Sequence, residues 1–226
     1  MNRATSNTQV LSYALAPSVH AVNVRDDLVV LDVLADAYYC LAGVGDAAAV
    51  SEDGRFVRGH TSALSSLLEA KLLSYDPVEE DRPRAPAPLD RNLRREWRGE
   101  RRTSLASLLD VMATGWRAHR DIRRLSFAQL VEAARREPVN LKRRTRLPQA
   151  VAAFDATRPW APFDGDCLFR AYWQLLFLRR LGVVGVRWVF GVRTFPFFAH
   201  CWLQREDLVL SDDPDALAGY RRIMVV

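Results

Sequence analysis

Four prolines within 12 residues divide this chain into two parts with different patterns. They lie between Asp76 and Leu89, in a stretch with charges of both signs, at positions 77, 83, 86 and 88. Proline removes a backbone donor and fixes φ, so such a stretch continues neither a helix nor a central strand. We therefore predict a first domain over residues 10–76, a Pro/Arg-rich linker over 77–100 and a second domain over 101–226.

The composition allows a core on each side of this linker and argues against several kinds of site. The chain has 226 residues, 49% of them hydrophobic, enough for one sizeable core or two small ones. Its three cysteines form no CxxC pair and its four histidines lack metal-ligand spacing, so we expect no metal and no disulfide framework. No apolar run approaches a membrane span and residues 1–9 lack a signal core, so we expect a cytoplasmic protein.

The first domain is predicted to be a small sheet followed by helices. Apolar and β-branched segments predict strands over 19–24, 28–34 and 37–41, which would form a three-stranded meander. A short helix is expected over 46–50, and leucines at helical spacing predict a longer helix over 61–73. A sheet followed by helices predicts a winged-helix-like module in the first domain. We assign the whole chain to the α+β class.

A helix that begins at Cys167 is the best-defined element predicted in the second domain. Asp166 is a residue type that caps helix N-termini, and Gly182 is a residue type that ends them. Cys167 therefore falls in the first turn of the helix. There the helix dipole and unpaired N–H groups favour the thiolate, and one such N–H could serve an oxyanion hole.

Three strands are predicted after this helix, over 184–192, 197–203 and 208–210. His200 lies inside the second strand, and Asp212 follows the third. The turn between these strands would bring Asp212 beside His200, where a carboxylate could hold one imidazole nitrogen and leave the other for Cys167. This is the papain-like set of groups. A cysteine on an apolar helix and a histidine in a strand are also common structural residues, so spacing alone leaves both interpretations open.

Five short segments add a resemblance to a known family. They are CLFR at 167–170, RRLG at 179–182, VFGVR at 189–193, FFAHCW at 197–202 and VLSD at 209–212. Together they resemble the transglutaminase-like leader peptidase of lasso peptide biosynthesis, from near Trp160 to the C-terminus. The resemblance implies that Cys167, His200 and Asp212 are catalytic, with Asp213 as a neighbouring alternative for the carboxylate. The family usually carries alanine at position 201 and asparagine at position 211, where this chain has cysteine and serine.

Segments of the first domain carry a second resemblance. LVVLD at 28–32, DAYY at 36–39 and LLE at 67–69 resemble the precursor-peptide recognition element of ribosomal peptide pathways, best known from the peptide chaperone of pyrroloquinoline quinone biosynthesis. Such modules add a leader peptide as a strand to a sheet edge, beside a helix with apolar pockets. Each side chain involved could equally be a packing residue. The resemblance implies an edge strand with Tyr38, Tyr39, Cys40 and Leu41, and a helix wall with Leu64, Leu68 and Lys71.

The two resemblances together imply a cysteine peptidase that binds the leader of a lasso precursor peptide and cleaves it from the core. An asparagine synthetase-like cyclase would then form the macrolactam, so the precursor and this cyclase are the expected partners. The family also implies a need for ATP, although the sequence contains no P-loop. Two alternatives stay open: an acyltransferase or transglutaminase with the same triad, and a non-catalytic leader-binding chaperone.

Positive charge is concentrated in the middle of the chain. Residues 82–146 contain 18 Lys and Arg against 7 Asp and Glu, whereas the whole chain has a net charge of +5. Amphipathic helices are predicted here over 105–116 and 127–134, so solvated helix surfaces are the simplest explanation. Nucleic-acid or nucleotide phosphates are the sharper alternatives. Because the basic residues are not on the predicted recognition helix, we expect no nucleic-acid partner.

Overall fold

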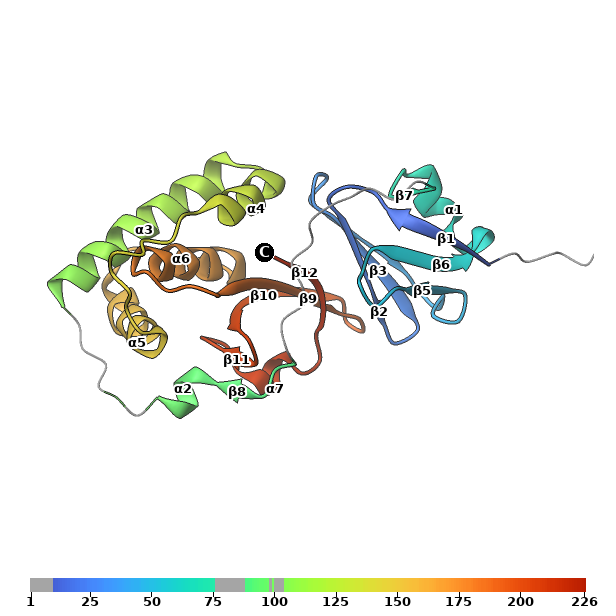
Figure 1. Ribbon diagram of the computed structural model, residues 1–226. Helices are drawn as coiled ribbons and strands as arrows, with labels where there is room; N and C mark the ends of the chain where they lie inside the picture. The colour runs from blue at the N-terminus through green and yellow to red at the C-terminus, as the bar shows by residue number, and fades with distance from the viewer. Residues whose placement is uncertain (1–9, 76–87, 98, 100–103) are drawn as a thin grey trace, which may run out of the picture. The chain divides into compact units, whose positions relative to one another are not determined.

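The described residues, 10–75, 88–97, 99 and 104–226 of a computed structural model, fall into two units (Figure 1). One unit is Met1–Arg82 with Val192–Phe197, and the other is Pro83–Gly191 with Phe198–Val226. Most of the predicted linker, namely residues 77–87, 98 and 100, lies outside the described residues. The chain is an α+β protein, with β-sheets in its N-terminal part.

The predicted meander in the first unit is confirmed. It consists of β2 (Val19–Val24), β3 (Asp27–Asp32) and β4 (Ala37–Leu41), paired in the order β2-β3-β4 (Figure 1). All four apolar residues at 28–31 in β3 are fully buried, as expected for a central strand whose two faces are both covered. β4 is an edge strand, and its residues Tyr39 and Cys40 are exposed.

A second sheet in this unit was not predicted. It contains β1 (Val10–Leu15), β5 (Ala48–Val50), β6 (Phe56–His60) and β7 (Leu73–Ser74), in the order β5-β6-β1-β7. The helix predicted over 46–50 is wrong, because β5 pairs antiparallel with β6. The side chain of Asn23 fixes this extended backbone: its Nδ2 donates to Ala48 O at 2.9 Å, and its Oδ1 accepts from Val50 N at 2.7 Å.

The one helix described between residues 10 and 75 is α1 (Thr61–Glu69), which ends earlier than predicted. It packs against β6 and β7, and its Leu64 and Leu67 are buried in a core shared with both sheets. Tyr13, Leu28 and Leu64 are completely buried there. Two sheets and a single helix do not show a winged-helix module, so that part of the fold prediction is not supported.

The second unit is a sheet with helices around one central helix. The sheet order is β12-β9-β10-β11-β8 (Figure 1). Its strands are β8 (Arg91–Asn92), β9 (Arg187–Arg193), β10 (Phe198–Arg205), β11 (Leu208–Val209) and β12 (Arg221–Val225). Its helices are α2 (Leu93–Glu96), α3 (Leu105–Arg124), α4 (Phe127–Arg136), α5 (Leu147–Thr157), the 3-10 helix η1 (Arg158–Trp160), α6 (Cys167–Arg180) and α7 (Pro214–Leu217).

Helix α6 forms the centre of this unit. It packs against α3, α5 and β10, and most of its surface is buried, including Tyr172, Trp173 and Phe177. A helix that is apolar nearly all round belongs in a core. Its predicted start and its end before Gly182 are confirmed, since Gly182 has a φ of +79° and an added Cβ would approach Asn140 O to 2.6 Å.

One end of the predicted linker is part of the second unit. Strand β8 pairs in parallel with β11, so residues 88–97 are not a linker. Asn92 explains this attachment. It is buried, its Oδ1 accepts from Arg95 N at 3.0 Å to cap α2, and its Nδ2 donates to the carbonyl of Asp212 at 2.8 Å. Proline-rich sequence before Asn92 gave no sign of such a distant partner.

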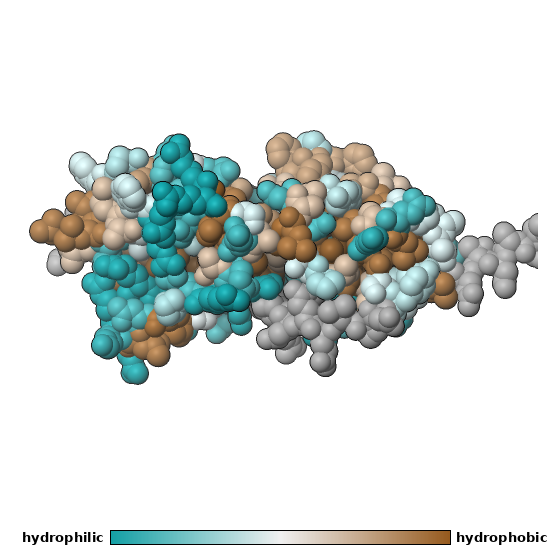
Figure 2. Space-filling model, turned by 90° about the horizontal axis from the view of Figure 1, so that it is seen from above, coloured by the Kyte–Doolittle hydropathy of each residue, from teal (hydrophilic) through white to brown (hydrophobic). Residues whose placement is uncertain are grey.

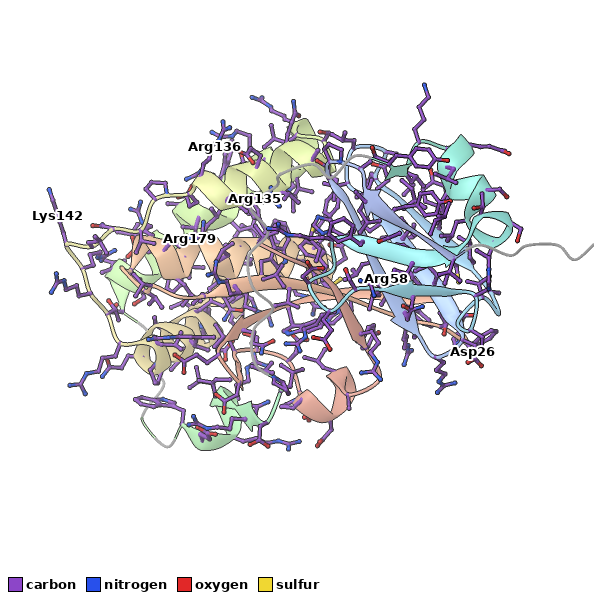
Figure 3. All side chains as sticks on the ribbon, turned by 45° about the vertical axis from the view of Figure 1, so that its right-hand side comes forward. Asp26, Arg58, Arg135, Arg136, Lys142 and Arg179 are labelled. Atoms are coloured by element: carbon purple, nitrogen blue, oxygen red, sulfur yellow. The ribbon has the colours of Figure 1, made fainter. Side chains whose placement is uncertain are left out.

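Part of the basic middle segment forms internal ion pairs. Asp110 of α3 is buried and accepts from Arg143 Nη1 at 2.5 Å and Arg180 Nε at 2.6 Å. Within the same segment, Arg117 of α3 pairs with Glu137 at 2.5 Å. Lys142, in contrast, projects away from the protein (Figure 3), and Figure 2 shows broad hydrophilic patches over this unit. The charge is thus partly structural and partly a solvated surface.

Asp110→Ala is expected to destabilise the protein by about 1–3 kcal/mol. The substitution removes the carboxylate that joins α3, α6 and residue 143, but both arginines are partly exposed and can regain water. Urea unfolding measures the change. Glu132→Gln is the matched control, because its pair with Arg136 is solvent-exposed and should be worth less than about 0.5 kcal/mol. Equal effects of the two substitutions would contradict the assigned role of Asp110.

Candidate active site

Cys167 is the first residue of α6, as the sequence predicts. The preceding residue, Asp166, caps the helix, since its Oδ1 accepts from Phe169 N at 3.0 Å. The capping carboxylate satisfies one of the free N–H groups of the first turn. Because Cys167 is the first residue of α6, its side chain lies at the positive end of the helix dipole, where a thiolate is favoured.

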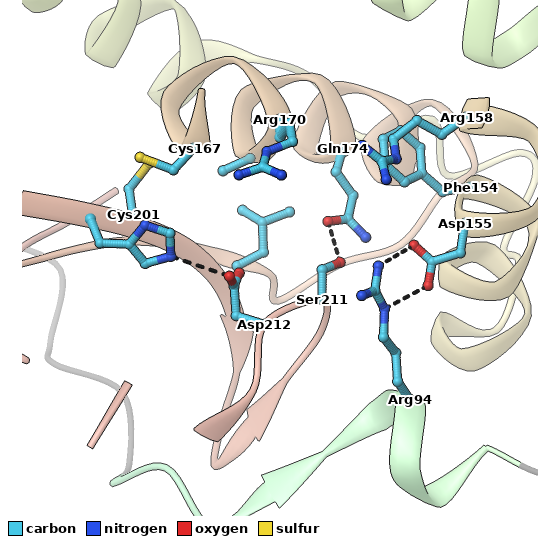
Figure 4. A pocket seen from close by; sticks show the side chains of 13 residues that line it. Arg94, Phe154, Asp155, Arg158, Cys167, Arg170, Gln174, Cys201, Ser211 and Asp212 are labelled. Atoms are coloured by element: carbon cyan, nitrogen blue, oxygen red, sulfur yellow. Dashed lines mark hydrogen bonds and ion pairs between the residues drawn. The ribbon is translucent and has the colours of Figure 1, made fainter. Parts of the chain in front are cut away.

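His200 and Asp212 meet on the adjoining sheet. His200 lies in β10 and Asp212 follows β11, and the distance from His200 Nε2 to Asp212 Oδ1 is 3.2 Å (Figure 4). Because Nε2 faces the carboxylate, Nδ1 is the ring nitrogen left for Cys167. The ring is also flanked by the aromatic rings of Trp202 and Tyr220, with centroids 6.3 and 5.7 Å away, which restrict its orientation.

The two adjacent carboxylates have different partners. Asp212 faces His200, and its backbone is held by Asn92. Asp213 instead accepts from Arg95 at 2.8 Å and caps α7 by accepting from Asp215 N at 3.1 Å. The geometry therefore favours Asp212 as the partner of the imidazole, and Asp213 has a structural role.

These three side chains line a pocket of about 120 Å³ (Figure 4). From Cys167 the pocket wall continues along one face of α6 to Arg170 and Gln174, at helical spacings of three and seven residues. Beyond them lies a bidentate ion pair in which Arg94 donates to Asp155 at 2.6 and 2.8 Å. The nucleophile candidate thus opens onto a polar pocket that holds three arginines, Arg94, Arg158 and Arg170.

Comparison with protein families gives one match. The sequence model of the transglutaminase-like superfamily matches residues 108–225, more than half of the chain. The chain belongs to the transglutaminase-like superfamily. The matched region runs from α3 to β12 and contains Cys167, His200 and Asp212. Searches of curated proteins and of solved structures gave no match.

In this transglutaminase-like unit the pKa values of the cysteine and histidine are shifted toward an ion pair. Hydrogen bonds from the Cys201 thiol and from His200 lower the pKa of Cys167 to about 4, although burial opposes the shift. The hydrogen bond to Asp212, followed by that to Cys167, raises the pKa of His200 to about 9. Burial raises the pKa of Cys201, so this neighbouring thiol stays protonated and can donate. Near neutral pH the site therefore holds a thiolate beside an imidazolium.

Alkylation of Cys167 by iodoacetamide is expected to accelerate as pH rises through about 4 and then to stay fast at neutral pH. Below about pH 4 the sulfur is protonated and unreactive, and above it the thiolate is the nucleophile. Mass spectrometry of the peptide that contains Cys167 measures the rate. Cys40 is an internal control: although the residue is largely exposed, partial desolvation and the charge of Asp27 raise the pKa of its thiol.

Cys201→Ala removes the largest cause of this shift and should move the inflection for Cys167 to higher pH. Cys40 should keep its own profile in the same sample. If Cys167 and Cys40 instead titrate together in the unaltered protein, the ion pair is not formed.

The structure places the predicted peptide-binding residues in different surroundings. Those at 38–41 share the edge strand β4, where Tyr39 is 39% exposed. Leu64 is fully buried and Leu68 packs on the same core, so Leu64 cannot line an open wall. Lys71 is exposed just after α1, with a φ of +58°. The edge strand is present, but Leu64 of the predicted helix wall is part of the core, and Leu68 is partly buried against it.

Several residues of the site were missed by the sequence analysis. Arg170 and Gln174 follow Cys167 at helical spacing and could have been found from that pattern. Asn92 and Arg94 had no local signal, because Asp212 and Asp155, with which they form hydrogen bonds, are more than 60 residues away in the chain.

The described residues contain neither a metal-binding cluster nor a membrane-spanning helix. Within the described ranges, no group of three or more His, Cys, Asp or Glu side chains could hold a metal ion. No helix among the described residues has both the length and the apolar character to cross a membrane.

Proposed function

We propose that this protein is a cysteine peptidase that removes the leader from a ribosomally made lasso precursor peptide. The arrangement of Cys167, His200 and Asp212 around one pocket carries the proposal of peptidase chemistry. The substrate class rests on the resemblance of the sequence around these residues to lasso leader peptidases. Membership of the transglutaminase-like superfamily is consistent with cysteine-based acyl chemistry.

In the proposed acylation step, the Cys167 thiolate attacks the scissile carbonyl carbon and forms a tetrahedral oxyanion. In this proposal the donors to this oxygen are backbone N–H groups at the start of α6 other than that of Phe169, which the Asp166 side chain already caps. The imidazolium of His200 then gives its Nδ1 proton to the leaving amine, and the C–N bond breaks. The products of this step are a free core amine and a thioester between Cys167 and the leader.

In the proposed deacylation step, His200 acts as a base. It takes a proton from water, whose oxygen attacks the thioester carbonyl and displaces the thiolate. Asp212 keeps the ring oriented through Nε2 and stabilises the imidazolium each time it forms. The released leader carries the new carboxylate, and the thiolate–imidazolium pair is restored.

The first unit is proposed to dock the leader. Strand β4 is the edge of its sheet, and unpaired edge groups can accept an extended peptide as a further strand. Tyr39 and Cys40 would flank that peptide, since both are exposed on β4. Docking at a tethered site raises the local concentration of the scissile bond, so contacts at Cys167 can be weak.

ATP has no step in this mechanism. The pocket beside Cys167, at about 120 Å³, is smaller than the roughly 300–1,000 Å³ of sites for drug-sized ligands. The sequence also lacks a P-loop. We therefore propose no nucleotide in this pocket. An asparagine synthetase-like cyclase remains the proposed partner that consumes the freed core amine.

The test is mass spectrometry of a leader-bearing lasso precursor incubated with the protein, with and without the cyclase and ATP. Free leader and core whose masses sum to the precursor plus one water would support a peptidase. An acyl fragment joined to an added amine would instead indicate a transferase. An intact precursor that still binds the protein in every lane would leave only a leader-binding chaperone.

A further inference from the structure

The pocket beside Cys167 has more positive than negative groups beyond the catalytic residues. Arg94 is neutralised by its bidentate pair with Asp155. Arg158 of η1 and Arg170 of α6 also line the pocket, and neither forms an ion pair with any other residue in the described part of the chain. The two carboxylates among the lining residues, Asp155 and Asp212, pair with Arg94 and His200, so neither is paired with Arg158 or Arg170.

An unpartnered amide lies in the same wall. Gln174 is 3% exposed, and its Oε1 accepts from Ser211 Oγ at 2.6 Å (Figure 4). Its Nε2 has no hydrogen-bond partner among the described residues. A buried donor without an acceptor is disfavoured, so a ligand acceptor in the pocket would complete the bonding of this side chain.

Solvation is the simplest explanation for exposed arginines, but it does not account for this combination. Arg170 and Gln174 lie on the helical face that begins with Cys167, and Arg158, which is half-buried, lines the same pocket from η1. Two arginines and a buried amide thus line one pocket next to the candidate nucleophile. Arginine forks match carboxylates, which accept two parallel hydrogen bonds.

We propose that this pocket is a specificity subsite for a carboxylate of the substrate peptide, bound by Arg158 and Arg170 and by Gln174 Nε2. The proposal builds on the proposed peptidase function, because it assumes a peptide near Cys167. The carboxylate could belong to an Asp or Glu side chain or to the C-terminus of a short substrate. The volume of about 120 Å³ suits one such group.

The first test needs no substrate. Alkylation of Cys167 is measured with iodoacetate, which carries a carboxylate, and with neutral iodoacetamide, by mass spectrometry of the peptide that contains Cys167. The ratio of the iodoacetate rate to the iodoacetamide rate is expected to fall about tenfold in R158Q/R170Q, because two of the charges that attract the reagent are lost. The single variant R170Q, which changes an exposed side chain, should show a smaller fall in the same direction.

The matched control is R123Q/R124Q, which removes two exposed arginines of α3 outside the pocket and should keep the original ratio. An equal ratio in all these proteins would overturn the subsite, whatever the peptidase assay gives. The use of a ratio cancels any general change in the reactivity of Cys167.

The second test identifies the source of the carboxylate. Precursor peptides are compared with each acidic residue near the cleavage site changed to its amide, and with the C-terminus as acid or amide. One of these changes should lower kcat/KM about tenfold with the original protein and have little effect with R158Q/R170Q. If all peptides are cleaved equally, the subsite proposal is wrong and the peptidase proposal stands. If no peptide is cleaved but the alkylation ratio still falls in R158Q/R170Q, the peptidase proposal is wrong and the pocket remains an anion-binding site.

Discussion

Replacing Cys167 with alanine is expected to abolish cleavage of the precursor while leader binding survives. The thiolate is the only proposed nucleophile, and the residual reaction would depend on binding and on the oxyanion donors. We expect kcat/KM to fall by a factor on the order of 10³ or more. Leader binding should be unchanged, because β4 belongs to the first unit and Cys167 to the second. Mass spectrometry measures cleavage, and fluorescence anisotropy of a labelled leader measures binding.

Thermal unfolding of the Cys167→Ala protein is the control for folding. Cys167 is only half-buried and stands in the first turn of α6, where alanine is compatible with the helix. Retained cleavage would remove Cys167 from the mechanism. Loss of leader binding in a protein that unfolds normally would contradict separate docking and cleavage sites.

The central helix and the three catalytic candidates were predicted because their signals are local. Asp166 and Gly182 mark the ends of α6, and the apolar residues between them repeat at helical spacing. Strands β10 and β11 are joined by a short turn, so the approach of Asp212 to His200 followed from adjacent sequence. The choice between Asp212 and Asp213 did not, because it depends on Asn92 and Arg95 from a distant segment.

The elements that were missed depend on pairing between distant segments. Residues 46–50 have no local strand pattern, and the extended backbone of β5 is fixed by Asn23 and by pairing with β6. Strand β8 is two residues long and pairs in parallel with β11, more than 100 residues later in the chain. Propensity is a weak guide where such partners decide the conformation. The polar end of the pocket was missed for the same reason, since Arg94 and Asp155 come from separate elements.

Asp212→Ala is expected to narrow the pH range of activity and to lower kcat/KM at neutral pH by a factor of about 10²–10³. The hydrogen bond that His200 Nε2 donates to Asp212 is the largest cause that raises the pKa of His200 to about 9. Without it, the imidazole should lose its proton at lower pH, and fewer molecules would hold the ion pair at pH 7. The alkaline limb of the kcat/KM profile should therefore move down from about 9 toward the ordinary range of histidine, near 6.5. The acid limb lies near the pKa of Cys167, about 4, and should move to higher pH. An imidazolium that loses its proton more readily stabilises the thiolate less.

Asp213→Ala is the matched control for this substitution. It removes a carboxylate one residue away that pairs with Arg95 and caps α7, so it should cost some stability but leave both limbs of the pH profile in place. Asp212→Asn should give an intermediate result, since an amide can still orient Nε2 but carries no charge to stabilise the imidazolium. If the pH profile shifts in Asp213→Ala and not in Asp212→Ala, Asp213 and not Asp212 is the carboxylate that acts on His200. The two neighbouring aspartates thus test whether orientation of His200, rather than general negative charge near β11, maintains the thiolate.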